Sequence, residues 1–295
     1  MIGALLLAAT VSCASDPSQT YEVRLPPGYT AEKRWPIVYV FDPRRRGAYA
    51  ADLFADAAAE FGWIVVSSND TRSDEDSDAN ARAIRAMWPD AQQRWSVDPR
   101  RIYTAGFSGG AILAWQVAKS TKKVAGVIGC SGRLDDARDA DDATFAWFGT
   151  AGDEDFNYLE TRMIDARLRG PHEFVSFAGA HQWPPKELLR EALAWMEAPK
   201  TSAQTYDDEN ELAFERAQRK KMTDAINRWL RSEQPASTLR RGLEIAKLQK
   251  DQRKAAKRVL NLIRVQLGFY LPAELRARGA AAKASELEAF ARAIQ

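Results

Sequence analysis

A Gly-x-Ser-x-Gly motif, GFSGG at residues 106–110, is the feature that most constrains how this chain folds. The apolar run 101–105 precedes the motif, and a helix-like segment, 111–118, follows it. In a strand–turn–helix context this motif indicates a nucleophile elbow, a strained turn that exposes a serine hydroxyl at the end of a sheet. Glycines flank the serine because a Cβ there would collide with the neighbouring strand or helix. The motif therefore predicts a reactive hydroxyl at Ser108.

The two histidines of the chain are the candidates for a base beside that serine. A serine hydroxyl becomes a good nucleophile when a base takes its proton and a carboxylate orients the base. His181 lies in a turn of small residues after the strand-like run 172–177, where a loop would return the imidazole to the serine. His172 opens that run, and we expect it to be a surface residue. The usual chain order, serine then acid then histidine, therefore assigns the base to His181.

The acid should lie between the serine and the histidine, just after a strand. Three carboxylates, Asp153, Glu154 and Asp155, follow the strand-like run 144–150. A solvated turn that caps the next helix is the plain alternative for this loop. We favour Asp155 as the acid, with Asp153 as the close alternative. Glu154 stays open because glutamate serves in some such triads, although alternation along the loop points it away from the other two.

These segments together resemble an α/β-hydrolase, specifically the esterase group that includes polyhydroxyalkanoate depolymerases and feruloyl and acetylxylan esterases. The resemblance is carried by VDPRRIY at 97–103, GFSGGA at 106–111, DFNY at 155–158 and the segment 179–185. It covers roughly residues 20–198. It implies hydrolysis of a carboxylic ester through an acyl-enzyme, with Ser108 as nucleophile, His181 as base and Asp155 as the residue that orients the base.

The loop after the first central strand departs from this group. Relatives usually carry His-Gly there, and a backbone N–H of that loop helps to form the oxyanion hole. This chain has DPRRRG at 42–47 after the apolar run 36–41. Pro43 has no N–H, so the second donor, beside the N–H of Gly109, must come from Arg44 or a neighbour. Oxyanion donors contribute ~3 kcal/mol each, so we expect the altered loop to change rate or substrate choice.

Three arginines in this loop have two interpretations. They could recognise an acidic group on a substrate, or they could form a solvated loop, which we favour.

Composition agrees with a folded chain of enzyme size. The length of 295 residues predicts one to two domains, and 45% hydrophobic residues can fill a buried sheet. The 42 basic and 40 acidic residues nearly balance, so we expect no nucleic-acid partner. Two histidines and two cysteines, scattered along the chain, form no ligand cluster, so we expect no metal and no other cofactor.

Apolar strand-like runs alternate with helix-like segments over residues 20–198. The expected strands are an early edge strand at 21–25, buried strands at 36–41 and 62–67, and later strands at 101–105, 124–130, 144–150 and 172–177. A helix is expected over 79–87, after the acidic stretch 74–78. Cys130 ends a strand, as a small buried core residue would. The alternation predicts an α/β fold, with a mainly parallel sheet and helices on both faces.

Residues 1–19 resemble a bacterial lipoprotein signal followed by a polar tether. The segment ALLLAATVSC at 4–13 ends at Cys13 with the small Ser12 before it. No Lys or Arg precedes the apolar stretch, and Thr10 stands where leucine is usual. We expect export, as a periplasmic protein or one attached to a membrane of the cell envelope through Cys13. A cytoplasmic protein with an apolar tail is the alternative.

Residues 199–295 are predicted to form a helical extension after a linker at 198–205. Helix-spaced apolar residues are Leu212, Phe214, Met222, Ile226, Trp229 and Leu230, then Leu239, Leu243, Ile245 and Leu248, then the segment 259–267. Ser285 and Glu288 form a capping box that should open the last helix. Basic clusters at 219–221 and 253–258 fit the solvated face of a small bundle better than a site for a protein partner or an anionic surface. The sequence does not distinguish a lid from an appendage.

The predicted function is a serine hydrolase acting on a small-molecule or glycan-linked ester. A serine peptidase or thioesterase on the same fold is one alternative. The other is a non-catalytic binding or scaffold protein, in which the loop 42–46 blocks the oxyanion site. Trp183 and Trp147 either line an aromatic pocket or belong to the core.

Overall fold

The computed structural model describes residues 8–73, 77–134, 136–201 and 206–294. The chain divides into two units, and each is described by itself. The sheet unit comprises Met1–Gly152, Glu160–Phe177 and His181–Ala203. The helical unit comprises Asp153–Leu159, Ala178–Ala180 and Gln204–Gln295.

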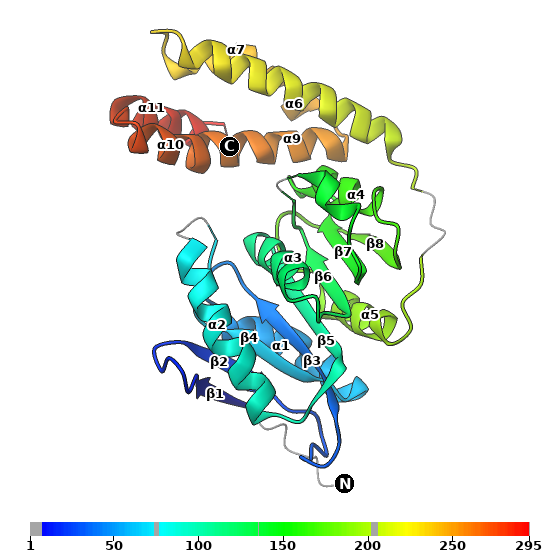
Figure 1. The fold of residues 1–295 in the computed structure, drawn as a ribbon. Helices are drawn as coiled ribbons and strands as arrows, with labels where there is room; N and C mark the ends of the chain where they lie inside the picture. The colour runs from blue at the N-terminus through cyan, green and yellow to red at the C-terminus, as the bar shows by residue number, and fades with distance from the viewer. Residues whose placement is uncertain (1–7, 74–76, 135, 202–205, 295) are drawn as a thin grey trace. The chain divides into compact units, whose positions relative to one another are not determined.

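The described part of the sheet unit contains one eight-stranded sheet with the order β1-β2-β4-β3-β5-β6-β7-β8 (Figure 1). Its strands are β1 (Ala8–Ser12), β2 (Thr20–Arg24), β3 (Trp35–Phe41), β4 (Ile64–Ser68), β5 (Val97–Phe107), β6 (Gly126–Cys130), β7 (Ala146–Gly152) and β8 (His172–Phe177). β1 and β2 pair antiparallel with their neighbours, and β3 to β8 are parallel. The predicted mainly parallel sheet is confirmed.

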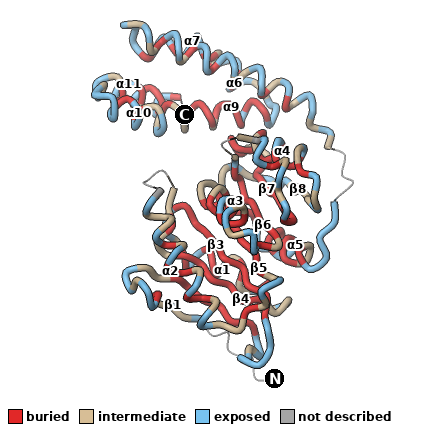
Figure 2. Tube along the Cα trace, viewed as in Figure 1, coloured by how far each residue is buried: buried red, intermediate tan, exposed pale blue. Residues whose placement is uncertain are grey.

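Helices cover both faces of this sheet, as the alternation along the chain predicts. The helices are α1 (Gly47–Phe61), α2 (Ser77–Arg94), α3 (Gly109–Thr121), α4 (Tyr158–Asp165) and α5 (Lys186–Glu197). Val38 on β3 belongs to the core cluster that α1 and α5 complete. The next residue, Tyr39, points to the opposite face and stacks on Trp88 of α2 with ring centroids 4.3 Å apart. Figure 2 shows the inner strands β3, β4, β6 and β7 as the buried centre between these helices.

Two expectations for the first half of the sheet unit need correction, one about a strand and one about a helix. The run 21–25 forms β2, but β2 is not an edge strand, because β1 pairs outside it. The expected helix at 79–87 is longer, since α2 runs from Ser77 to Arg94 with Pro89 inside it. Most of the acidic stretch expected to precede it, residues 74–76, lies outside the described residues.

The predicted signal and tether segment contributes to the fold where it is described. Residues 1–7 lie outside the described residues, but Ala8–Ser12 pairs with β2 along its whole length. Cys13 is buried, and its N–H donates to the carbonyl of Gln19 at 3.0 Å. Burial, reinforced by the carboxylate of Asp90, raises the pKa of the Cys13 thiol to about 11. Export and membrane attachment through Cys13 stay predictions that this fold does not test.

The helical unit has its own hydrophobic core. Its helices are α6 (Glu209–Leu230), α7 (Leu239–Gly242), α8 (Ile245–Lys250), α9 (Lys254–Val265), α10 (Leu271–Ala277) and α11 (Ala281–Arg292), with a π-helical turn over Gln266–Tyr270. Met222, Leu243, Val259 and Leu287 are among the buried residues of this core. In the described part of the chain, no helix is long and apolar enough to cross a membrane.

Two predictions for the helical unit are wrong. Ser285 does not open the last helix, because α11 begins one turn earlier, at Ala281, in an alanine-rich stretch that favours helix. The basic clusters are also not wholly solvated. Arg258 is only 2% exposed, and the side chain of Arg219 is 15% exposed, because both guanidinium groups bind the buried Glu215.

Candidate active site

Ser108 stands on the predicted elbow between β5 and α3. Its φ of 53° and ψ of −122° lie in a region that non-glycine residues rarely adopt. Its N–H donates to the carbonyl of Cys130, at the end of β6, at 2.9 Å. Backbone strain of this kind occurs at functional sites when surrounding contacts hold it in place.

The glycines of the motif let the chain approach its neighbours closely. A Cβ on Gly106 would lie 2.1 Å from the carbonyl oxygen of Gly110, and a Cβ on Gly110 would lie 2.0 Å from the carbonyl oxygen of Phe41. A Cβ on Gly109 would lie 2.2 Å from the Cβ of Ser73. The elbow is thus packed between the end of β3 and the segment that follows β4. Gly109 is the first residue of α3, where backbone N–H groups lack partners within the helix.

The side chain of His181 lies within hydrogen-bond distance of Ser108. The Nε2 of His181 lies 2.9 Å from the Oγ of Ser108. The imidazole packs against Phe107, with ring centroids 4.7 Å apart. The other histidine, His172, is placed elsewhere: its Nδ1 lies 2.9 Å from the carbonyl oxygen of Gly170, and its Nε2 lies 3.9 Å from Asp165.

The three carboxylates after β7 belong to the helical unit, and each has different partners within it. Asp153 pairs with Lys254, and Glu154 pairs with Lys257 at 2.5 Å. Asp155 is fully buried, and its Oδ1 accepts a 2.8 Å hydrogen bond from the N–H of Asn157. Burying a carboxylate costs free energy unless polar groups hydrogen-bond to it. Asp155 is the one of these three carboxylates that is fully buried and hydrogen-bonded to the backbone.

The acid loop and the histidine loop are hydrogen-bonded to each other. The N–H of Glu154 donates to the carbonyl of Gly179 at 2.9 Å, and the N–H of Gly179 donates to the carboxylate of Asp153 at 3.2 Å. Gly179 stands two residues before His181 in the chain. Within the helical unit, the structure therefore joins the loop of the three carboxylates to the segment Ala178–Ala180.

Asp42, for which the sequence predicts no role, organises the loop after β3. It is fully buried, and its carboxylate accepts hydrogen bonds from the N–H of Arg44 at 2.9 Å, from two nitrogens of Arg46 at 3.0 and 2.8 Å, and from the Nε1 of Trp183 at 2.8 Å. An aspartate directly after a buried strand was the available signal, but its partner Trp183 is distant in sequence.

This network bears on the second oxyanion donor. The N–H of Arg44, the donor expected from the sequence, already donates to Asp42, so it is not free in this conformation. Other backbone N–H groups of the same loop remain the candidates for the second oxyanion donor. The side chains of Arg44 and Arg45 are exposed, in agreement with a solvated loop, and Arg45 has a left-handed φ of 59°.

The two tryptophans near the predicted site belong to the core. Trp183 is 5% exposed and packs against Phe107 and Phe54, with ring centroids 5.6 and 6.0 Å apart. Trp147 is 2% exposed and lies against Gly149, where a Cβ would come within 1.8 Å of the indole. Their burial agrees with the core alternative, although Trp147 also lines a small cavity with Ala111 and Trp115.

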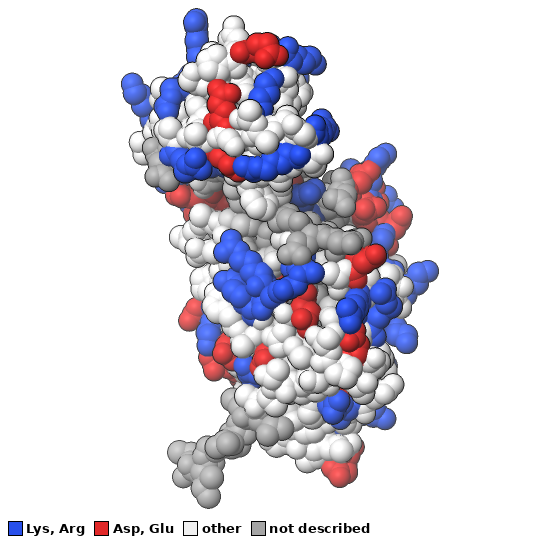
Figure 3. All heavy atoms as spheres, turned by 90° about the vertical axis from the view of Figure 1, so that its left-hand side faces the viewer, with Lys and Arg blue, Asp and Glu red and all other residues white. Residues whose placement is uncertain are grey.

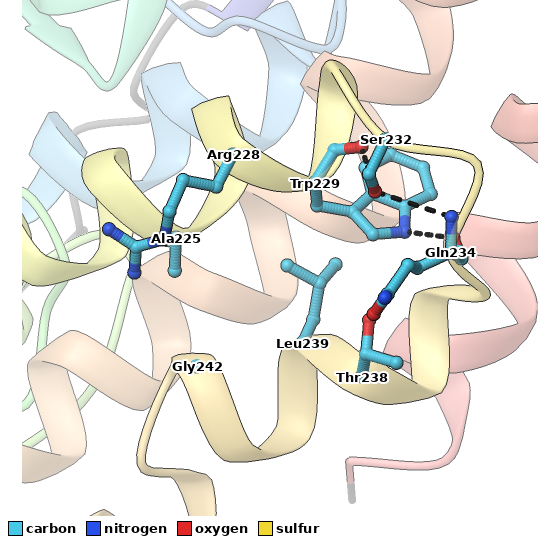
Figure 4. Close-up of a pocket in the computed structure, with 8 residues that line it drawn as sticks. All are labelled: Ala225, Arg228, Trp229, Ser232, Gln234, Thr238, Leu239 and Gly242. Atoms are coloured by element: carbon cyan, nitrogen blue, oxygen red, sulfur yellow. Dashed lines mark hydrogen bonds between the residues drawn. The ribbon is translucent and has the colours of Figure 1, made fainter.

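A pocket of about 310 Å³ lies within the helical unit (Figure 4). The indole of Trp229 forms part of its wall, and its N–H donates to the carbonyl of Gln234 at 2.9 Å. Ser232 and Gln234 also bond to each other there. The indole N–H of Trp229 and the hydroxyl of Ser232 are thus hydrogen-bonded within the wall of the pocket. Basic and acidic side chains occur together on the face shown in Figure 3, and neither sign covers it.

Comparisons with known proteins agree with this architecture. A family model described as phospholipase/carboxylesterase matches residues 57–148. Est1E from Butyrivibrio proteoclasticus is 13% identical over 65% of this chain and 99% of its own, with a TM-score of 0.51. A serine-to-alanine variant of the feruloyl esterase module from Clostridium thermocellum, complexed with sinapinate, is 15% identical over 68% of this chain and 91% of its own, with a TM-score of 0.53.

A peptidase has a similar structure. The acylaminoacyl peptidase of Pyrococcus horikoshii is 12% identical over 70% of this chain and 44% of its own, with a TM-score of 0.54. No curated protein matches the sequence. The chain has the α/β-hydrolase fold, and the resemblance to the esterase group of that fold is confirmed.

Proposed function

We propose that this chain is a serine hydrolase that cleaves a carboxylic ester through an acyl-enzyme intermediate. The observation that carries the proposal is the 2.9 Å separation of His181 Nε2 and Ser108 Oγ on a strained elbow. This distance is within the range for direct proton transfer. The match to a phospholipase/carboxylesterase family model and the similarity to esterase structures support an ester as the substrate.

In the proposed reaction, Ser108 Oγ attacks the ester carbonyl carbon while His181 Nε2 accepts its proton. The N–H of Gly109 donates to the oxyanion of the tetrahedral intermediate, and a neighbour of Arg44 supplies the second donor. The intermediate collapses as the leaving alcohol takes the proton from His181, which leaves the acyl group on Ser108. Water then attacks this acyl group by the same steps and restores the free serine.

Asp155 is proposed to hold the His181 imidazole in the tautomer that accepts the serine proton. Its complete burial supports this role over that of its neighbours. Asp153 and Glu154 each pair with a lysine of α9, and their side chains are 16% and 34% exposed. An orienting carboxylate in such a site is buried and stays ionised during turnover.

The similarity to an acylaminoacyl peptidase gives a second candidate, a serine peptidase or thioesterase on the same machinery. Aryl esters, thioesters and anilides with one common acyl group would separate these activities, with Ser108→Ala as the blank. We expect kcat/KM to be highest for the ester. A higher value for the anilide would assign a peptidase, and a higher value for the thioester a thioesterase. No turnover of any substrate by the folded protein would favour a non-catalytic binding role.

A further inference from the structure

Side chains of α6 and α9 hold the loop that carries Asp155. Within the helical unit, three backbone carbonyls of this loop accept hydrogen bonds from these helices. The bonds join Arg258 Nη1 to Asp153 O at 3.0 Å, Asn261 Nδ2 to Glu154 O at 3.0 Å and Arg219 Nη2 to Phe156 O. Asp155 stands between the anchored carbonyls, so the backbone is fixed on both sides of its carboxylate.

A buried carboxylate joins the two arginines. Glu215 on α6 accepts from Arg258 Nε at 2.7 Å through one oxygen and from Arg219 Nε at 3.0 Å through the other. Glu215 is fully buried, and Arg258 is 2% exposed. Removing such charges from water costs several kcal/mol per ion, and well-packed apolar residues often stabilise a fold at least as well. The buried ion pairs of Glu215 are therefore weak evidence for a purely stabilising role. They hold the two arginines that bind the carbonyls of Asp153 and Phe156.

Aromatic contacts fix the same loop further. The Phe156 side chain is part of the helical core that includes Val259. The guanidinium of Arg258 lies over the ring of Tyr158, 4.3 Å from its centroid, and the Tyr158 hydroxyl donates to Asp208 at 2.9 Å. Arg258 thus contacts the loop both before and after Asp155.

We propose that Arg258 and Arg219, bridged by Glu215, are positioning residues for Asp155, the proposed acid, through contacts made within the helical unit. The proposal rests on the serine hydrolase function proposed above. A misplacement of about 1 Å in a catalytic group can cost ~100-fold in rate.

Kinetics of Arg258→Met, which keeps an apolar stem and loses every donor, test the proposal. We expect kcat for an aryl ester to fall ~10- to 100-fold with KM within about twofold, because the substrate contacts are retained and the base is misoriented. Arg258→Lys, which keeps one cationic donor group, should recover part of the loss. If Arg258→Met does not fold, Arg219→Met, at the more exposed arginine, replaces it with the same expectation.

Two control variants separate positioning from general destabilisation. Leu287→Ala empties a fully buried site in the same helical core and should lower the Tm, with kcat unchanged at temperatures where it is folded. Arg276→Met removes an exposed ion pair with Glu288 and should change neither quantity. Hydrogen exchange at the Asn157 amide, which donates to Asp155, should accelerate in Arg258→Met and stay slow in Leu287→Ala.

Unchanged kcat in folded Arg258→Met, or an equal loss in folded Leu287→Ala, would overturn the positioning role. A parent protein that is folded but neither turns over esters nor reacts with a serine-directed probe would refute the proposed function, and the positioning role with it. The two failures are distinct, because the first requires an active parent.

Discussion

The indole N–H of Trp183 donates a 2.8 Å hydrogen bond to the carboxylate of Asp42, 141 residues earlier in the chain. This bond joins the loop after β3 to the loop that carries His181, two residues before Trp183. Three further nitrogens, from Arg44 and Arg46, bind the same carboxylate. The two loops that flank the proposed nucleophile are therefore held by one buried side chain.

Trp183→Phe should lower both the stability and the rate of reaction of Ser108. A hydrogen bond to a charged group contributes ~1.5–3 kcal/mol, and its loss frees the histidine loop. Trp115→Phe is the matched control, because the buried Trp115 Nε1–H has no partner among the described residues. Chemical denaturation of both variants should show the larger loss for Trp183→Phe. Equal losses would mean that the Asp42 bond contributes nothing measurable.

Gly110→Ala should disrupt the elbow. Its Cβ would lie 2.0 Å from the carbonyl oxygen of Phe41, a backbone atom that cannot move without shifting β3. We expect a loss of ~3 kcal/mol in the free energy of unfolding, at the upper end of overpacking costs, and slow reaction of Ser108 with probes.

Gly170→Ala provides the comparison for that variant. The nearest atom to its Cβ would be the Phe145 carbonyl oxygen at 3.8 Å, an ordinary contact. Its stability should stay within ~0.5 kcal/mol of the parent. A Gly110→Ala variant as stable and reactive as Gly170→Ala would show that the elbow tolerates a methyl group.

Both cysteines should be unreactive in the folded protein. Burial raises the pKa of each thiol, to about 11 for Cys13, and the thiolate is the reactive form. Reaction with a disulfide reagent at pH 8 should be slow and should still accelerate between pH 9 and 11, where an ordinary thiol with a pKa of ~8.5 has levelled off. Denatured protein should show two fast thiols, matching the two cysteines of the chain. A fast thiol in the native protein would contradict the buried positions.

The mature N-terminus separates the two interpretations of residues 1–19. Cleavage at a lipoprotein site would start the chain at an acylated Cys13 and remove β1. In the structure β1 pairs with β2, and the N–H of Ala14 donates to Asp90 at 2.8 Å. The predicted attachment through Cys13 requires that the intact mass of the protein recovered from producing cells begin at acylated Cys13. A mass that retains Ala8–Ser12 would contradict that attachment.

Much of the fold could be predicted because its signals are local. The apolar runs that became β3 and β4 are short, continuous and bounded by turns. The run that became β1 was harder, because a short apolar stretch of small residues fits a signal segment and an edge strand equally well. Its pairing with β2 is not visible in the local pattern, and it does not test whether the segment is also cleaved as a signal.

The residues of the candidate site also differ in whether their signals are local in the sequence. Ser108 is predictable because its motif imposes a turn, and His181 because the chain offers few histidines. The roles of Asp42 and Arg258 depend on partners far along the chain, Trp183 for the first and Asp153 for the second. A buried arginine has the same sequence signature as a solvated one when it lies in a basic cluster, so Arg258 was assigned to a solvated face.

Labelling of the purified protein with a fluorophosphonate probe tests the central claim most directly, with Ser108→Ala, His181→Ala and Asp155→Asn beside it. We expect the parent to be labelled on Ser108, Ser108→Ala to stay unlabelled, and the other two variants to react at least ~100-fold more slowly. Circular dichroism should show that all four proteins are folded. A folded parent that stays unlabelled, or label that persists in Ser108→Ala, would contradict the proposal that Ser108 is the nucleophile.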